Sequence, residues 1–159
     1  GAVTTRMSSG MPDLTGLSVS DVATATSITL AADTISVINY TGAAAATCTL
    51  PAATQGTVVV YCQAVDTTGG TNTLVFDAAG SDVWATGSVI ESRASSEVTF
   101  DTSAAGETKL TFTPANAATN LLTIGGQIAF ICYEKGTWHI ASSLARETTQ
   151  TTGAFAFAS

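Results

Sequence analysis

The sequence consists of short stretches rich in β-forming residues, separated by turn residues that return roughly every 8 to 12 positions. No window of about 11 residues shows the apolar period of a helix. The one alanine run, Ala43 to Ala46, lies between Gly42 and Pro51 and is too short to nucleate a helix alone. The pattern predicts an all-β protein, a β-sandwich or barrel-like antiparallel domain. We expect strands over 26–30, 34–40, 46–50, 57–65, 72–76, 88–92, 96–100, 108–113, 121–124, 127–134 and 137–142.

Several of these stretches alternate apolar and polar residues, as a strand with one face in the core does. Leu110 and Phe112 share one side of their strand, and so do Val98 and Phe100. We expect both pairs to face the core.

Two stretches, 56–62 and 126–132, are instead apolar on both faces. Each begins with glycine and has a cysteine six positions later, Cys62 and Cys132. They are predicted to be central strands covered on both sides. Their shared register indicates an internal duplication or two adjacent strands in equivalent places, and a chance likeness of β-rich segments explains it equally well.

The segment 133–140 has the features of a hairpin, with Lys135-Gly136 at a turn where positive φ is needed. Trp138 is expected in the core, and His139 on the opposite face toward solvent.

Residues 1–24 are predicted to form an extended docking arm ahead of a β-domain over 25–145. Gly10, Pro12 and Gly16 interrupt every regular period there. Ordering such a segment is favourable only if a large partner surface covers its apolar side chains. The residues expected to bind that partner are Arg6, Met7, Met11, Leu14 and Leu17.

The C-terminal tail, 146–159, ends with Phe155 and Phe157 at alternate positions. We expect this tail to add to a neighbour's sheet edge or to fill its groove. With 29 Thr, 27 Ala and only 11% charged residues, the surface has few charges to repel a second copy. The tail and the surface together predict a homo-oligomer.

The charge pattern argues against nucleic acid and anionic membrane surfaces as partners. The net charge is −7, and the five basic residues are spread singly along the chain. Phosphate binding needs clustered Lys and Arg. The chain also has no apolar stretch of about 18 residues that could span a membrane.

The sequence predicts no catalytic, cofactor or metal site. His139 is the single histidine, and no local nucleophile or orienting group accompanies it. The three cysteines form no CxxC pair, so we expect reduced, buried thiols. The oxygen-rich segment 66–72 is better explained by a turn than by calcium.

Three segments give the chain its resemblance to the β-domains of tailed-phage virion proteins. These are Thr49-Leu50-Pro51-Ala52-Ala53 leading to Gly56-Thr57, then Thr71-Asn72-Thr73-Leu74-Val75-Phe76, and the closing Tyr133-Glu134-Lys135-Gly136-Thr137-Trp138-His139-Ile140. The chain is most similar in style to head decoration (cement) proteins. That resemblance implies a structural role on the capsid surface of a virion, usually as a trimer whose extended arms clamp the major capsid protein.

Two alternatives remain open at this point. One is a tail-tube or fibre β-domain of a virion. The other is a secreted adhesin or carbohydrate-binding module, in which an exposed Trp84 would stack on a sugar.

Overall fold

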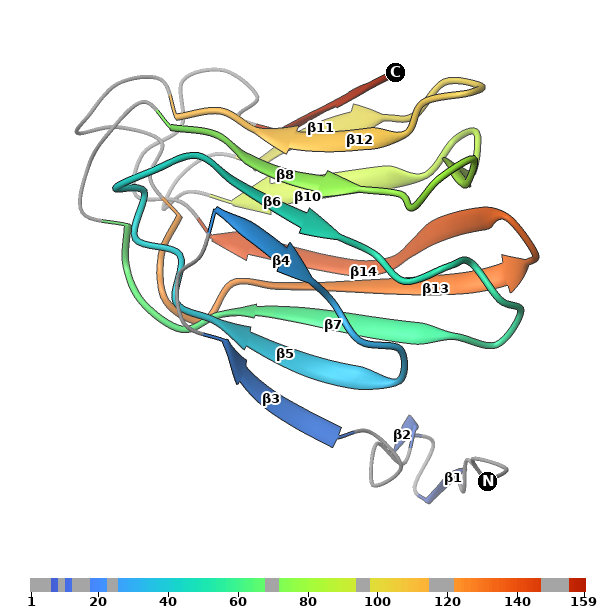
Figure 1. Cartoon of the computed structure of the whole chain (residues 1–159), viewed down its shortest axis with the longest axis horizontal. Coiled ribbons are helices and arrows are strands. Elements are labelled where there is room, and N and C mark those ends of the chain that lie inside the picture. The colour runs from blue at the N-terminus through green and yellow to red at the C-terminus, as the bar shows by residue number, and fades with distance from the viewer. Residues whose placement is uncertain are drawn as a thin grey trace.

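The computed structural model describes residues 7–8, 11–12, 18–22, 26–67, 72–93, 98–114, 122–146 and 155–159, and these contain strands and no helix. Two mixed β-sheets pack face to face as a sandwich (Figure 1). The all-β class and the sandwich predicted from the sequence are confirmed.

The larger sheet has eight strands. Seven follow the order β11-β10-β14-β13-β7-β5-β3, and β9 pairs with β14 beside this path. Their bounds are β3 Ser18–Val22, β5 Thr34–Ile38, β7 Val58–Gln63, β9 Val83–Trp84, β10 Val89–Arg93, β11 Val98–Thr102, β13 Gln127–Glu134 and β14 Thr137–Arg146.

The smaller sheet has five strands in the order β15-β12-β8-β6-β4. Their bounds are β4 Ser27–Thr29, β6 Ala46–Thr49, β8 Leu74–Asp77, β12 Lys109–Phe112 and β15 Phe155–Ala158. Two further strands, β1 Met7–Ser8 and β2 Met11–Pro12, pair only with each other among the described strands.

In the first half of the sandwich the chain coils around the core, so that successive strands of the same sheet run parallel. From β3 to β8, successive strands alternate between the two sheets, so β3, β5 and β7 pair in parallel in one sheet. In the other sheet, β4, β6 and β8 do the same. This corrects the expectation of an antiparallel domain. A strand that crosses to the opposite sheet and returns a full turn later runs in the same direction as its predecessor.

Two aspartates, Asp33 within this coil and Asp82 after it, accept hydrogen bonds from backbone groups at or before the start of β7. Val58 donates its backbone N–H to Asp33 Oδ1 over 3.1 Å, and Ala53 donates to Asp82 Oδ2 over 2.7 Å. Asp33 has a φ of 53°, a left-handed conformation that aspartate tolerates better than most residues. The carboxylates satisfy turn N–H groups that would otherwise have no partner near the core.

The second half of the chain closes both sheets, mainly in antiparallel pairs. In the larger sheet β13 pairs with β7 and β14, while β12 joins β8 to β15 in the smaller one. The two stretches that are apolar on both faces are therefore adjacent antiparallel strands. The predicted hairpin between β13 and β14 is also confirmed, with Gly136 at a φ of 83° in its turn.

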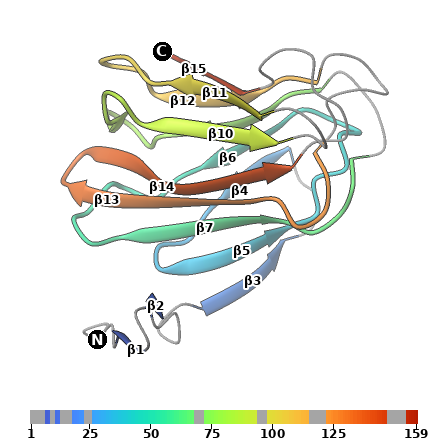
Figure 2. The same ribbon diagram turned by 180° about the vertical axis from the view of Figure 1, so that it is seen from behind.

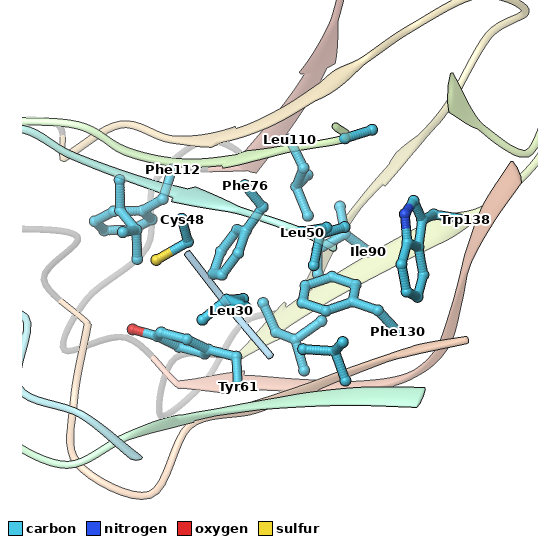
Figure 3. Packing of buried hydrophobic residues seen from close by; sticks show 14 of the residues in the cluster. Leu30, Cys48, Leu50, Tyr61, Phe76, Ile90, Leu110, Phe112, Phe130 and Trp138 are labelled. Carbon is cyan, nitrogen blue, oxygen red and sulfur yellow. The ribbon is translucent and has the colours of Figure 1, made fainter. Parts of the chain in front are cut away.

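The core fills the space between the sheets (Figure 3). Phe76 from the smaller sheet meets Tyr61 at 4.9 Å between ring centroids and Phe130 at 5.3 Å. Trp138 is fully buried, as its position in the hairpin predicted. Leu110 and Phe112 also face this core, as their alternation predicted.

The strand pattern differs from the sequence-based expectation in several places, which include the unexpected strands β1, β2 and β9. Residues 121–124 form no strand in the part that is described, where Leu122 makes only an isolated bridge. β3 falls within the segment expected to be an arm, and β15 falls within the expected tail.

Candidate functional site

The residues predicted to dock a partner through the N-terminal arm fall in and around β1 and β2. Met7 pairs in register with Pro12, and Met11 pairs with Ser8. Arg6, Leu14 and Leu17 lie outside the described residues. The docking role of these five residues stays a prediction.

Phe155 and Phe157, predicted to bind a neighbouring copy, lie instead in the core of their own chain. The two side chains are 4% and 8% exposed. Phe155 packs 5.2 Å from Phe112 between ring centroids, and Phe157 packs 5.7 Å from Trp84. The structure therefore corrects their expected position, because β12 offers these rings an apolar edge of the same sandwich.

Trp84, the candidate sugar-stacking residue, is also buried. Its side chain is 1% exposed and lies 5.5 Å from Phe130 between ring centroids. In this position it offers no exposed ring face to a sugar. His139 lies on the face opposite Trp138, as predicted, and its ring meets that of Tyr133 edge-on at 4.9 Å.

A buried polar network connects β7 to the segments that follow β5 and β7. Tyr61 donates its hydroxyl hydrogen to Gln63 Oε1. Gln63 Nε2 donates to the carbonyl oxygens of Tyr40 and Val65, both over 2.7 Å. The hydroxyl of Tyr40 donates to the carbonyl oxygen of Asn72 over 2.7 Å. Each donor in this network has an acceptor, so the network fixes the ends of β5 and β7 without leaving an unpaired group.

Burial also sets the acid–base behaviour of this region. It raises the pKa of Tyr40 to about 12 and holds that of Tyr61 well above its usual 10. Nearby Cys48, Tyr40 and Cys62 raise the pKa of Tyr61 further, in smaller amounts. Both phenols therefore remain protonated near neutral pH and act as hydrogen-bond donors.

The three thiols are free and occupy two different environments. Cys48 and Cys132 are fully buried, which confirms the sequence-based expectation for them. Cys62 is only partly buried, because its side chain points to the outer face of the larger sheet, next to Val37 and Gln127 in register. The expectation that all three are buried is therefore corrected at Cys62.

The outer face of the smaller sheet is polar. Alternate positions there place mainly threonines and charged groups outward, because the residues between them are buried. The outward residues include Thr47, Thr49, Asp77, Lys109 and Thr111.

The outer face of the larger sheet is mainly apolar, with Glu91, Gln127, His139 and Ser142 among its polar positions. Figure 2 looks onto this face, and no described strand lies in front of β10, β14, β13, β7 and β5. Register and burial place the following apolar side chains on it: Ile35, Val37, Val58, Val60, Cys62, Ala129, Ile131, Tyr133, Leu144, Val89, Val98 and Phe100.

Val98 and Phe100 correct a prediction, since their alternation suggested that they face the core. They are 45% and 64% exposed. The inward positions near the end of β11 belong to Asp101 and Ser103, whose side chains bond to backbone groups of β15 and of the β9–β10 connection. Those bonds fix the strand with its apolar side outward.

The described part of the chain contains neither a cluster of metal-binding side chains nor a membrane-spanning helix. No group of three or more His, Cys, Asp or Glu residues there could hold a metal ion. The same residues include no helix of the length and apolarity required to cross a bilayer.

In comparisons with known proteins, no family model and no curated protein sequence matches the chain.

Proposed function

We propose that this chain is a structural virion protein that decorates and stabilises a phage capsid, without catalysing a reaction. Its partners in this proposal are the major capsid protein and further copies of itself, as a homotrimer on the capsid surface. The three sequence segments that resemble head decoration proteins support it. The closing one forms the β13–β14 hairpin, and Trp138 anchors that hairpin in the core.

The observation that carries the proposal is the separate sheet formed by β1 and β2. These strands pair with each other and with no other described strand. In Figure 1 they lie beyond β3, at one end of the sandwich. A segment that carries methionines and does not join the sandwich is suited to contact another protein. In a cement protein that contact is with the capsid.

A truncation series tests this role. Because β3 pairs with β5, the informative cut removes residues 1–17 and leaves Ser18–Val22 in place. We expect this variant to keep the fold by circular dichroism and to lose binding to capsids that carry no decoration protein. The matched control removes residues 1–5 only. If the 1–17 deletion binds capsids as tightly as the full chain, the arm is not the anchor.

Electron microscopy of virions with this protein labelled separates the alternatives. Many labels over the head support decoration, whereas a few labels at the tail indicate a tail-tube or fibre domain. No label on the particle, combined with binding to a glycan array, would instead indicate a secreted sugar-binding module.

A further inference from the structure

The larger sheet buries its inner face, and no described strand covers its mainly apolar outer face. Strands β7 and β13 have the composition of strands covered on both sides. On β7 the outward side chains are Val58, Val60 and Cys62, and on β13 they include Ile131 and Tyr133. The outer face of the smaller sheet is rich in threonine and charge, so the apolar character is specific to one side of the sandwich.

This face has two halves that differ in how far their side chains are exposed to solvent. On β10 and β11, Val89, Val98 and Phe100 are 43%, 45% and 64% exposed and form the protruding patch. On β5 and β7, Ile35, Val37, Val58 and Val60 are only partly exposed and form the flat patch. The two patches lie on opposite sides of β13 and β14 in the sheet order.

The projected size of the face lies in the range of apolar patches that mark interaction sites and is about half of what one partner of a stable pair buries. From β5 to β11 the sheet spans five strand spacings. At about 4.8 Å per spacing and about 17 Å of strand length, the face covers about 400 Å² in projection. Its accessible surface exceeds this projected area. A stable pair of proteins buries about 800 Å² per partner, and contiguous apolar patches of about 300–600 Å² already mark interaction sites.

The charge pattern favours a second copy over an oppositely charged partner. The chain has a net charge of −7, yet in the described part of this face the charged side chain is Glu91, among apolar neighbours. Arg93 and Arg146 occupy paired register positions at the end of β10 and β14. Register positions of both signs, Glu91 with Arg93 and Arg146, therefore lie at one end of this face, so it favours neither a basic nor an acidic surface, and an identical face complements it.

We propose that this outer face is the surface through which copies of this chain associate, with the protruding patch of one copy packed on the flat patch of the next. Phe100 is the anchor of the contact, since a large exposed aromatic that becomes buried typically dominates an interface. This inference rests on the self-association in the proposed function and replaces Phe155 and Phe157 as the residues responsible for it.

Sedimentation velocity of the purified full-length chain over a wide range of concentrations tests the contact. We expect the wild type to assemble and Phe100→Glu to associate at least about tenfold more weakly. Phe100 is mostly exposed in the single copy, so this change leaves folding intact. The matched control is Thr111→Glu, which places the same charge on the outer face of the smaller sheet and leaves assembly unchanged.

The native Cys62 thiol gives a second measurement that needs no substitution. It lies beside the flat patch, so its labelling slows as the protein is concentrated and assembles. A wild-type chain that stays monomeric at every concentration, or a Phe100→Glu variant that assembles as tightly as the wild type, would overturn the proposal. These measurements use the free protein, so they can fail while capsid binding through residues 1–17 succeeds, and the reverse.

Discussion

The backbone N–H of Phe157 donates a hydrogen bond to Asp101 Oδ2 over 2.7 Å. This bond joins β15, the edge strand of the smaller sheet, to β11, the edge strand of the larger one. It closes the sandwich at the end opposite to β3 and β4. Asp101 thereby links the last strand of the chain to a strand more than 50 positions earlier.

We expect Asp101→Ala to lower the free energy of unfolding by about 1–3 kcal/mol, because it leaves a partly buried N–H without its charged acceptor. Asp101→Asn keeps an acceptor oxygen in place and should lose less. Urea unfolding followed by tryptophan fluorescence measures both. Equal stability of Asp101→Ala and the wild type would mean that solvent already satisfies the Phe157 N–H.

Removal of residues 153–159 is expected to destabilise the fold itself. The deletion takes away β15 with Phe155 and Phe157, and each buried phenylalanine contributes about 1.5–3 kcal/mol. We therefore expect a loss of about 3–6 kcal/mol in chemical denaturation, together with exposure of Phe112. Removal of Ser159 alone is the control. A truncated chain that unfolds at the same urea concentration as the wild type would place β15 outside the stable core.

The fold class could be predicted from the sequence because turn spacing and strand alternation are local properties. Turn spacing and alternation located most strands of the two sheets, and Gly136 marked the hairpin turn. Pairing direction is not local. Turns every 8 to 12 residues fit a chain that doubles back in hairpins, and they fit equally a chain that crosses between sheets, as it does from β3 to β8.

The candidate surfaces were harder to predict for a related reason. Alternation divides a strand into two faces without saying which face is buried. In β11 the deciding residues are Asp101 and Ser103, whose partners lie far away in the sequence. The both-sided apolar pattern of 56–62 and 126–132 was the signal that the larger sheet has two faces to cover. Its meaning became specific only when the structure showed one of those faces without a described strand over it.

Thiol labelling of the native protein should divide the three cysteines into two classes. In dilute solution we expect Cys62 to react first, because it is partly exposed. Burial raises the pKa of all three thiols, so the difference comes from access: Cys48 and Cys132 are fully buried and the reagent does not reach them in the folded protein. Mass spectrometry after a short pulse identifies the modified residue, and labelling in urea gives the fully reactive reference. Rapid modification of Cys48 in the native state would contradict the packing described between the sheets.

Alkaline pH should destabilise the protein through its buried thiols and phenols, chiefly Cys48, Tyr40 and Tyr61. Burial raises the pKa of Cys48 from 9.0 to about 12 and that of Tyr40 from 10.0 to about 12. It also holds the pKa of Tyr61 well above 10.0. In the unfolded chain these groups lose their protons near their usual pKa values, while the folded chain retains them. The unfolded state therefore binds fewer protons above about pH 9, and the free energy of unfolding falls as the pH rises toward 12.

Urea unfolding at several pH values between about 8 and 11 measures this slope, which each group steepens by up to about 1.4 kcal/mol per pH unit. Cys48→Ala removes one titrating group and should flatten the slope between about pH 9 and 11, whatever it does to stability at pH 8. Tyr61→Phe should flatten it above about pH 10. If stability stays constant over this whole range in the wild type, the thiol of Cys48 and the phenols of Tyr40 and Tyr61 reach water in the folded state, and the network around Gln63 is open rather than closed.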